Sequence, residues 1–165
     1  MTMELHGFKE LERELLKFPT TLARRSLGRA VASGAAVVRK AARIAAAAQG
    51  LRLTGLLARS IKIKSVRSRN RGTRRYKVYH SDSEYIKAGK VGKDGKAQNY
   101  GRLYEGGFKD MSRHKPHLRP ALDENTSAVI KAIRDRLSKE IRVMRFETAT
   151  GLKYKKAFES QLGNY

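Results

Sequence analysis

The chain contains no cysteine and no tryptophan, and only 7% of its residues are aromatic. The lack of cysteine excludes disulfide bonds, thiol catalysis and cysteine-ligated zinc sites, and it is compatible with a reducing cytoplasm. With 165 residues and a hydrophobic fraction of 40%, the chain is long enough for one domain with a modest core. We therefore expect neighbouring subunits to complete part of its apolar surface.

Long apolar runs are also missing. No stretch approaches the roughly 20 apolar residues that a membrane-spanning helix needs, so we expect no membrane partner. The first 17 residues carry four Glu and lack the apolar centre of a signal peptide. The sequence therefore predicts a protein that is not secreted.

Acidic residues are scarce, and one long stretch has none. Asp and Glu number 15 against 37 Lys and Arg, which gives a net charge of +22, and no acidic residue occurs between Leu15 and Ser81. Self-repulsion at this charge disfavours a compact isolated monomer. We therefore expect a negatively charged partner, with nucleic acid as the first candidate and an acidic protein surface as the second.

Apolar residues at three- and four-residue spacing predict two helices in the first third of the chain. A short amphipathic helix over Phe8–Phe18 should end before Pro19, because the residue before proline avoids the α region. A long basic helix over Thr20–Ala48 carries a stripe of Ala and Val, with Gly28 and Gly34 near it. Small residues allow close approach of another element, either from the same chain, which is the simpler interpretation, or from an adjacent subunit.

The middle of the chain predicts a small antiparallel sheet. Ile61 and Ile63 alternate with two lysines, and Tyr76, Val78 and His80 alternate with Lys77 and Tyr79, as expected for two paired strands. The tip between the strands is a basic hairpin that carries Arg67, Arg69, Arg71, Arg74 and Arg75. A solvated charged hairpin is the simplest interpretation, followed by docking onto an acidic protein and then by loose contact with DNA phosphates.

The second half of the chain is less regular. Asp82–Asn99 contains three glycines and predicts a mobile loop, and Tyr100–Gly107 is compatible with a strand or one helical turn. A second strong helix is predicted over Pro120–Arg145. Thr148–Tyr165 has only weak periodicity.

These elements together predict an α+β fold. A long N-terminal helix and a C-terminal helix pack on a small antiparallel sheet, with a basic hairpin and extended loops. We expect one domain over residues 1–145 and a C-terminal extension over residues 146–165 that becomes ordered on partners.

No pattern of catalytic residues stands out. The four histidines, His6, His80, His114 and His117, are scattered along the chain, and no carboxylate stands at ligand spacing beside the last two. Surface or hydrogen-bonding histidines are the simpler interpretation. The Gly-rich loop Gly89–Lys96 lacks the P-loop pattern. The sequence therefore predicts no enzyme, no metal and no cofactor.

Three segments resemble a family of phage proteins in their order and spacing. They are Leu53–Ile61, Tyr100–Gly107 and Lys115–Asp123, and Leu5–Leu11 and the basic helix precede them. The chain is similar to the tail-component family of long-tailed phages (siphophages), which includes neck proteins similar to minor tail protein Z of the lambdoid phages. Members typically show Thr-Gly-x-Leu-x-x-Ser-Ile, Tyr-x-x-x-Val-Glu-Phe-Gly and Pro-x-x-Phe-Leu-Arg-Pro-Ala. Three positions of this chain depart from the pattern, where Tyr104 replaces Val, Gly106 replaces Phe and His117 replaces Phe.

The resemblance implies a structural virion protein of the phage neck. It implies a homo-oligomeric ring around the DNA channel, with a head-side connector or stopper on one side and tail terminator or tube proteins on the other. We expect a hexamer from the symmetry of tails, and localisation in the virion after assembly in the host cytoplasm. The resemblance implies no catalytic residues. The alternative, from charge alone, is a free-standing basic nucleic-acid-binding protein.

Two residues of the resembling segments suggest a structural connection. We predict that Glu105 forms an ion pair with Arg119 and so holds two connectors together, and that Arg119 and Pro120, just before the last helix, fix its start. The competing interpretation is a solvent-exposed Glu105. An exposed pair would contribute only about 0–1 kcal/mol.

Overall fold

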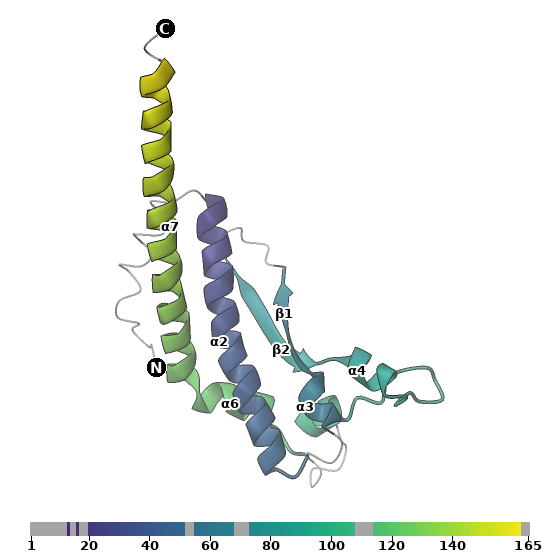
Figure 1. Ribbon diagram of the computed structural model, residues 1–165. Helices are drawn as coiled ribbons and strands as arrows, with labels where there is room; N and C mark the ends of the chain where they lie inside the picture. The colour runs from purple at the N-terminus through teal and green to yellow at the C-terminus, as the bar shows by residue number, and fades with distance from the viewer. Residues whose placement is uncertain are drawn as a thin grey trace. The chain divides into compact units, whose positions relative to one another are not determined.

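A computed structural model of the chain has the α+β fold predicted from the sequence (Figure 1). It describes residues 13, 16, 20–51, 55–67, 73–107 and 114–162, and the side chains of these residues except 20, 107 and 145–162. The chain divides into two compact units, one of Met1–Ala30 with Arg134–Tyr165 and the other of Val31–Ile133. No helix in the described ranges is long and apolar enough to cross a membrane.

Helix α2 spans Thr20–Ala48, which confirms the predicted long basic helix. Gly50 follows its end, and the φ of this glycine, 75°, lies in the left-handed region. There the Leu51 N–H donates to the Ala46 carbonyl and the Gly50 N–H to the Ala47 carbonyl, a common helix C-terminus. The helix predicted over Phe8–Phe18 falls outside the described residues except for residues 13 and 16, which are helical.

Strands β1 (Ile61–Val66) and β2 (Arg75–His80) form the predicted antiparallel hairpin. The register pairs Ile61 with His80 and Ile63 with Val78. Directly opposed residues lie on the same face of a sheet, so the two alternating patterns in the sequence meet on one face. Residues 68–72 of the hairpin tip lie outside the described residues.

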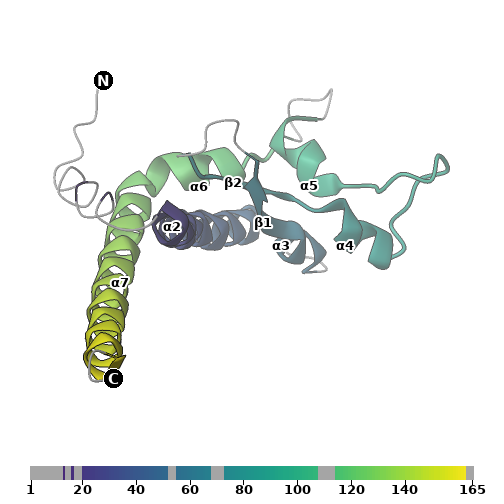
Figure 2. The same ribbon diagram turned by 90° about the horizontal axis from the view of Figure 1, so that it is seen from above.

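Short helices surround the His80 end of this hairpin. They are α3 (Leu56–Ser60), α4 (Asp82–Lys87) and α5 (Tyr100–Arg102), which continues into the π-helical turn η1 (Leu103–Gly107). In Figure 2, α3, α4 and α5 lie together at one end of the strands, and α3 contacts α4, α5 and both strands.

The mobile loop predicted over Asp82–Asn99 is partly wrong, because its first six residues are helical. Asp82 and Glu84 in the first turn suit the helix dipole, and the buried Tyr85 anchors the helix with only 1% of its surface exposed. The segment that follows is closed by a bridge between Val91 and Ala97. Helix α4 is too short to carry an apolar pattern from which the sequence could predict it.

The helix predicted over Pro120–Arg145 is two helices, α6 (Leu118–Glu124) and α7 (Thr126–Leu162). Pro120 lies in the first turn of α6, where a missing N–H costs no intrahelical bond. At the break, the Asn125 side chain donates to the Ala121 carbonyl and the Thr126 hydroxyl to the Leu122 carbonyl. Helix α7 continues without interruption through residues 146–162, where the sequence showed weak periodicity.

The core of the Val31–Ile133 unit is small and rich in alanine. Its buried residues are Val38, Ala42, Ala46, Leu57, Ile61 and Ala121. At Gly34 of α2, an added Cβ would lie 2.8 Å from Ile133 Cγ1 and 3.1 Å from Val129 Cγ1. The close approach predicted for the small-residue stripe is therefore made at Gly34 within the chain itself.

In the other unit, a buried carboxylate joins α2 to α7. Glu140 accepts from Arg29 at 2.9 Å and from Arg136 at 2.6 Å. The Ser26 hydroxyl lies 3.5 Å from both the Glu140 carboxylate and the Met144 sulfur. Two arginines thus compensate the charge of a side chain that is only 8% exposed.

A buried histidine pair with Glu105 as the candidate functional site

The described part of the basic hairpin faces solvent. Arg67, Arg74 and Arg75 are exposed, and Arg69 and Arg71 lie outside the described residues. The structure therefore places the three described arginines where a partner can reach them, as expected for a docking surface and equally for a solvated hairpin.

The side chain of Glu105 contacts the backbone at the start of α6. Its carboxylate accepts hydrogen bonds from the N–H groups of His117, Leu118 and Arg119 at 3.0, 3.1 and 3.1 Å. These groups belong to the first turn of α6, which has no intrahelical acceptors for them. The carboxylate of Glu105 therefore caps α6 from a distant part of the chain.

This arrangement corrects the predicted ion pair between Glu105 and Arg119. The two residues do meet, but through the Arg119 backbone N–H. The guanidinium of Arg119 is 89% exposed and lies 3.9 Å from Asp123, one helical turn away. Three backbone donors satisfy Glu105 more completely than one long, flexible side chain in solvent.

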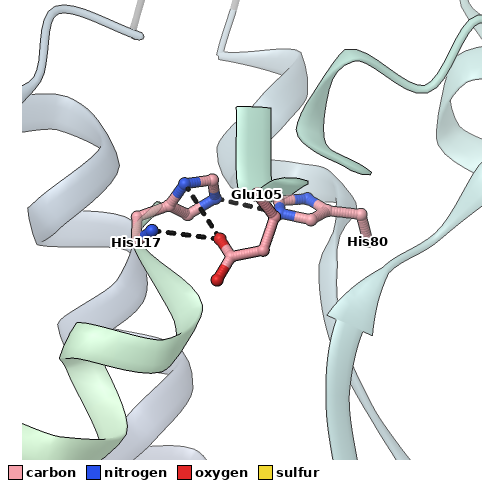
Figure 3. A group of neighbouring side chains, drawn as sticks. All are labelled: His80, Glu105 and His117. Carbon is pink, nitrogen blue, oxygen red and sulfur yellow. Dashed lines mark hydrogen bonds and ion pairs between the residues drawn. The ribbon is translucent and has the colours of Figure 1, made fainter. Parts of the chain in front are cut away.

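Two histidines meet beside this carboxylate (Figure 3). His80 ends β2 and His117 precedes α6, and their Nε2 atoms lie 2.9 Å apart. The rings meet edge to face, with centroids 4.9 Å apart and an interplanar angle of 67°. His117 is fully buried and His80 is 4% exposed, so the pair is shielded from bulk water.

The other ring nitrogens face oxygen atoms. His80 Nδ1 lies 2.9 Å from the Ser60 hydroxyl, which itself donates to the Leu57 carbonyl at 2.7 Å. His117 Nδ1 lies 2.9 Å from the Lys115 carbonyl and 3.5 Å from Glu105 Oε2. Since the hydroxyl proton of Ser60 is already engaged and the other partners are acceptors, both Nδ1 atoms act as donors.

Burial lowers the pKa of His80 to about 4, and the neighbouring His117 acts in the same direction while Glu105 opposes it. His80 is therefore neutral at physiological pH, with its proton on Nδ1 and a lone pair on Nε2. Space around the ring is tight as well. A Cβ at Gly101 would overlap the His80 ring, and the Gly101 N–H donates to the Tyr85 hydroxyl at 3.2 Å.

The interpretation of the histidines as hydrogen-bonding residues is confirmed for these two, which are distant in the sequence but meet in the fold. His80, His117 and Glu105 bring their ligand-type atoms within 4.8 Å of one another. Two imidazoles and one carboxylate form a donor set that suits zinc and related metals. Little in the sequence indicates this site, because 37 residues separate the two histidines. The hairpin register in the structure places His80 opposite Ile61.

The three segments used for the sequence resemblance converge here. Ser60 comes from the first, Glu105 from the second and His117 from the third. The Lys115 N–H also donates to the Tyr104 carbonyl at 3.0 Å, which ties the second segment to the third. Comparison of the chain with family models, with curated proteins and with solved structures found no match.

Proposed function

We propose that the chain is a structural subunit of a phage neck that joins the head to the tail by assembling into a ring around the DNA channel. The observation that carries the proposal is the meeting of the three resembling segments at one buried junction, which Ser60, Glu105 and His117 link by hydrogen bonds. Glu105 accepts hydrogen bonds from the start of a helix, which is a scaffolding role, so the proposed mechanism is binding and not catalysis.

The composition of the core supports assembly with other subunits. The buried cluster contains three alanines among six residues, and the large side chains of Ile44, Ile86 and Val143 are 61%, 53% and 53% exposed. Burial of apolar surface contributes about 25 cal/mol per Å². Covering such side chains in a ring would therefore add stability that a single copy does not have.

The net charge supports an acidic neighbour. The exposed Arg67, Arg74 and Arg75 project from a segment without any acidic residue. Docking onto acidic surfaces of the head-side connector or the tail terminator would relieve the repulsion within the chain, and so would contact with packaged DNA. The proposed location is the virion.

The test is to replace Arg67, Arg69, Arg71, Arg74 and Arg75 with Gln in a phage that encodes this chain. We expect a folded subunit by circular dichroism, but separated heads and tails in electron micrographs and a loss of infectivity. Unchanged particle assembly and infectivity would contradict docking through the hairpin. The control replaces exposed lysines of another segment, Lys87, Lys90, Lys93 and Lys96, with Gln.

A free-standing nucleic-acid-binding protein is the competing function, favoured by the net charge of +22. Electrophoretic mobility shifts at physiological salt, combined with the mass of the free protein, separate the two functions. Tight binding by a monomer or dimer would favour the competitor. Ring-sized assemblies with weak binding would favour the neck subunit.

A further inference from the structure

We propose that His80 and His117 bind one zinc-type divalent metal ion through their Nε2 atoms, with the Glu105 carboxylate as the third ligand. The site lies within the Val31–Ile133 unit and does not depend on the proposed function. Its three ligands come from the end of β2, from η1 and from the residue before α6, so a bound metal would cross-link three distant segments.

The first support is the orientation of the rings. Metal-binding histidines usually donate their other ring N–H to a carbonyl, a carboxylate or another oxygen, and this contact sets the tautomer and the ring plane. His117 Nδ1 has the Lys115 carbonyl at 2.9 Å, and His80 Nδ1 has the Ser60 hydroxyl at 2.9 Å. Both rings are thus held with their Nε2 atoms turned toward each other, 2.9 Å apart.

The second support is a count of protons. With both Nδ1 atoms donating, two neutral rings leave their Nε2 lone pairs facing each other across 2.9 Å. A metal ion between the two nitrogens would accept both lone pairs. Zinc–nitrogen bonds of about 2.0–2.1 Å place two nitrogen ligands of a tetrahedral zinc ion about 3.3 Å apart. The two Nε2 atoms would therefore have to move apart by only a few tenths of an ångström.

A metal ion in this place requires a negative ligand, because His117 and His80 are only 0% and 4% exposed and imidazole ligands are neutral. The negative charge of Glu105 compensates part of the charge of a metal. Its two oxygens offer about four acceptor positions, of which the backbone of α6 uses three.

An open pocket lies next to the cluster and has room for water. Its lining includes His80, Glu105, Gly106 and Leu118. A water molecule would supply the fourth ligand of a four-coordinate ion.

The experiment uses the full chain without an affinity tag, stripped with a chelator and then titrated with zinc chloride. We expect one zinc per chain by mass spectrometry of the metal content, a higher melting temperature with zinc, and nitrogen and oxygen ligands by X-ray absorption. Absence of stoichiometric zinc in the folded chain would overturn the proposal.

Variants identify the ligands. His117→Phe keeps a buried ring of similar size and should lower zinc affinity by at least about 100-fold, because losing a ligand costs more than losing a residue that only hydrogen-bonds to a ligand. His80→Ala should lower the affinity by a similar factor. Circular dichroism checks that each variant is folded. His6→Ala and His114→Ala are the matched controls and should bind zinc as the unchanged chain does. Zinc binding that survives the combined His80 and His117 replacements would also overturn the proposal.

Discussion

Glu105 satisfies three backbone donors with one side chain. The N–H groups of His117, Leu118 and Arg119 would otherwise have no acceptor at the start of α6. Charged acceptors make the stronger hydrogen bonds, and the carboxylate also lies at the positive end of the helix dipole. The stability of this junction therefore depends on Glu105, whereas the exposed Arg119 side chain contributes little.

Replacing Glu105 with Ala should lower the free energy of unfolding by about 1–3 kcal/mol, because it removes a cap and leaves partly buried donors unpaired. Urea denaturation of the metal-free chain measures the change. Asp123→Ala removes another carboxylate near α6 that is 66% exposed and should change stability by less than about 0.5 kcal/mol. Equal effects of the two replacements would show that Glu105 does not act as the cap.

His80 makes the stability of the metal-free chain depend on pH. Its pKa falls from 6.5 to about 4 on folding, mainly because of burial. Between these values the unfolded chain binds a proton that the folded chain does not, so stability decreases as pH falls from about 6.5 to 4. At about 1.4 kcal/mol per pKa unit, the loss is on the order of 2–3 kcal/mol.

Urea denaturation at several pH values, with a chelator present, measures this dependence. His80→Phe should remove most of it. Lys62 lowers the pKa of Glu84 below its ordinary value of 4.5 by a hydrogen bond, which also destabilises the fold in acid, but only at a lower pH than the His80 window. If the stability of the His80→Phe variant depends on pH as strongly as that of the parent chain between pH 6.5 and 4.5, the assignment to His80 is wrong.

Among the elements, α2 shows how a helix with little bulk can still pack closely. The backbone at Gly34 approaches α7 so nearly that a Cβ would lie 2.8 Å from Ile133 Cγ1. Glycine costs roughly 1 kcal/mol relative to alanine inside a helix. The close contact with Val129 and Ile133 offsets that cost, so this position is selected by packing and not by helix propensity.

Gly34→Val should therefore destabilise the chain by about 1–3 kcal/mol through overpacking, although valine forms helices better than glycine. Thermal or urea unfolding measures the change. Ala48→Val, at an exposed position of the same helix, is the control and should cost only a few tenths of a kcal/mol. A Gly34→Val chain as stable as its parent would mean that the contact with Ile133 relaxes without cost.

At the scale of the whole molecule, the net charge of +22 and the small core have opposite effects on the association of copies. Repulsion among like charges opposes the association of copies, and the burial of exposed apolar side chains favours it. Salt screens the first effect over a Debye length of about 10 Å at 0.1 M and leaves the second nearly unchanged.

Sedimentation of the purified chain should therefore show larger assemblies as sodium chloride is raised, while binding to duplex DNA should weaken over the same range. A neck subunit requires the growth of assemblies at higher salt. A chain that stays monomeric at every salt concentration and protein concentration, with tight DNA binding at physiological salt, would contradict ring assembly and favour the nucleic-acid-binding alternative.

The sequence by itself determined the features that repeat along the chain. The three- and four-residue spacing in Thr20–Ala48 predicted α2 with its observed bounds, and alternation in Ile61–Lys64 and Tyr76–His80 predicted the paired strands. Net charge and the lack of cysteine depend on composition alone. Such signals are local or summed over the chain, so they can be read without knowing how it folds.

Tertiary structure alone decided the contacts of single polar side chains. His80, Glu105 and His117 stand at positions with no common period, and they meet because the hairpin, η1 and the start of α6 fold against one another. The same is true of the capping role of Glu105, which was predicted as an ion pair with Arg119, and of the short helix α4, which Tyr85 anchors by burial. One hydrogen bond between distant residues leaves no periodic pattern in a sequence, and its geometry exists only once the chain has folded.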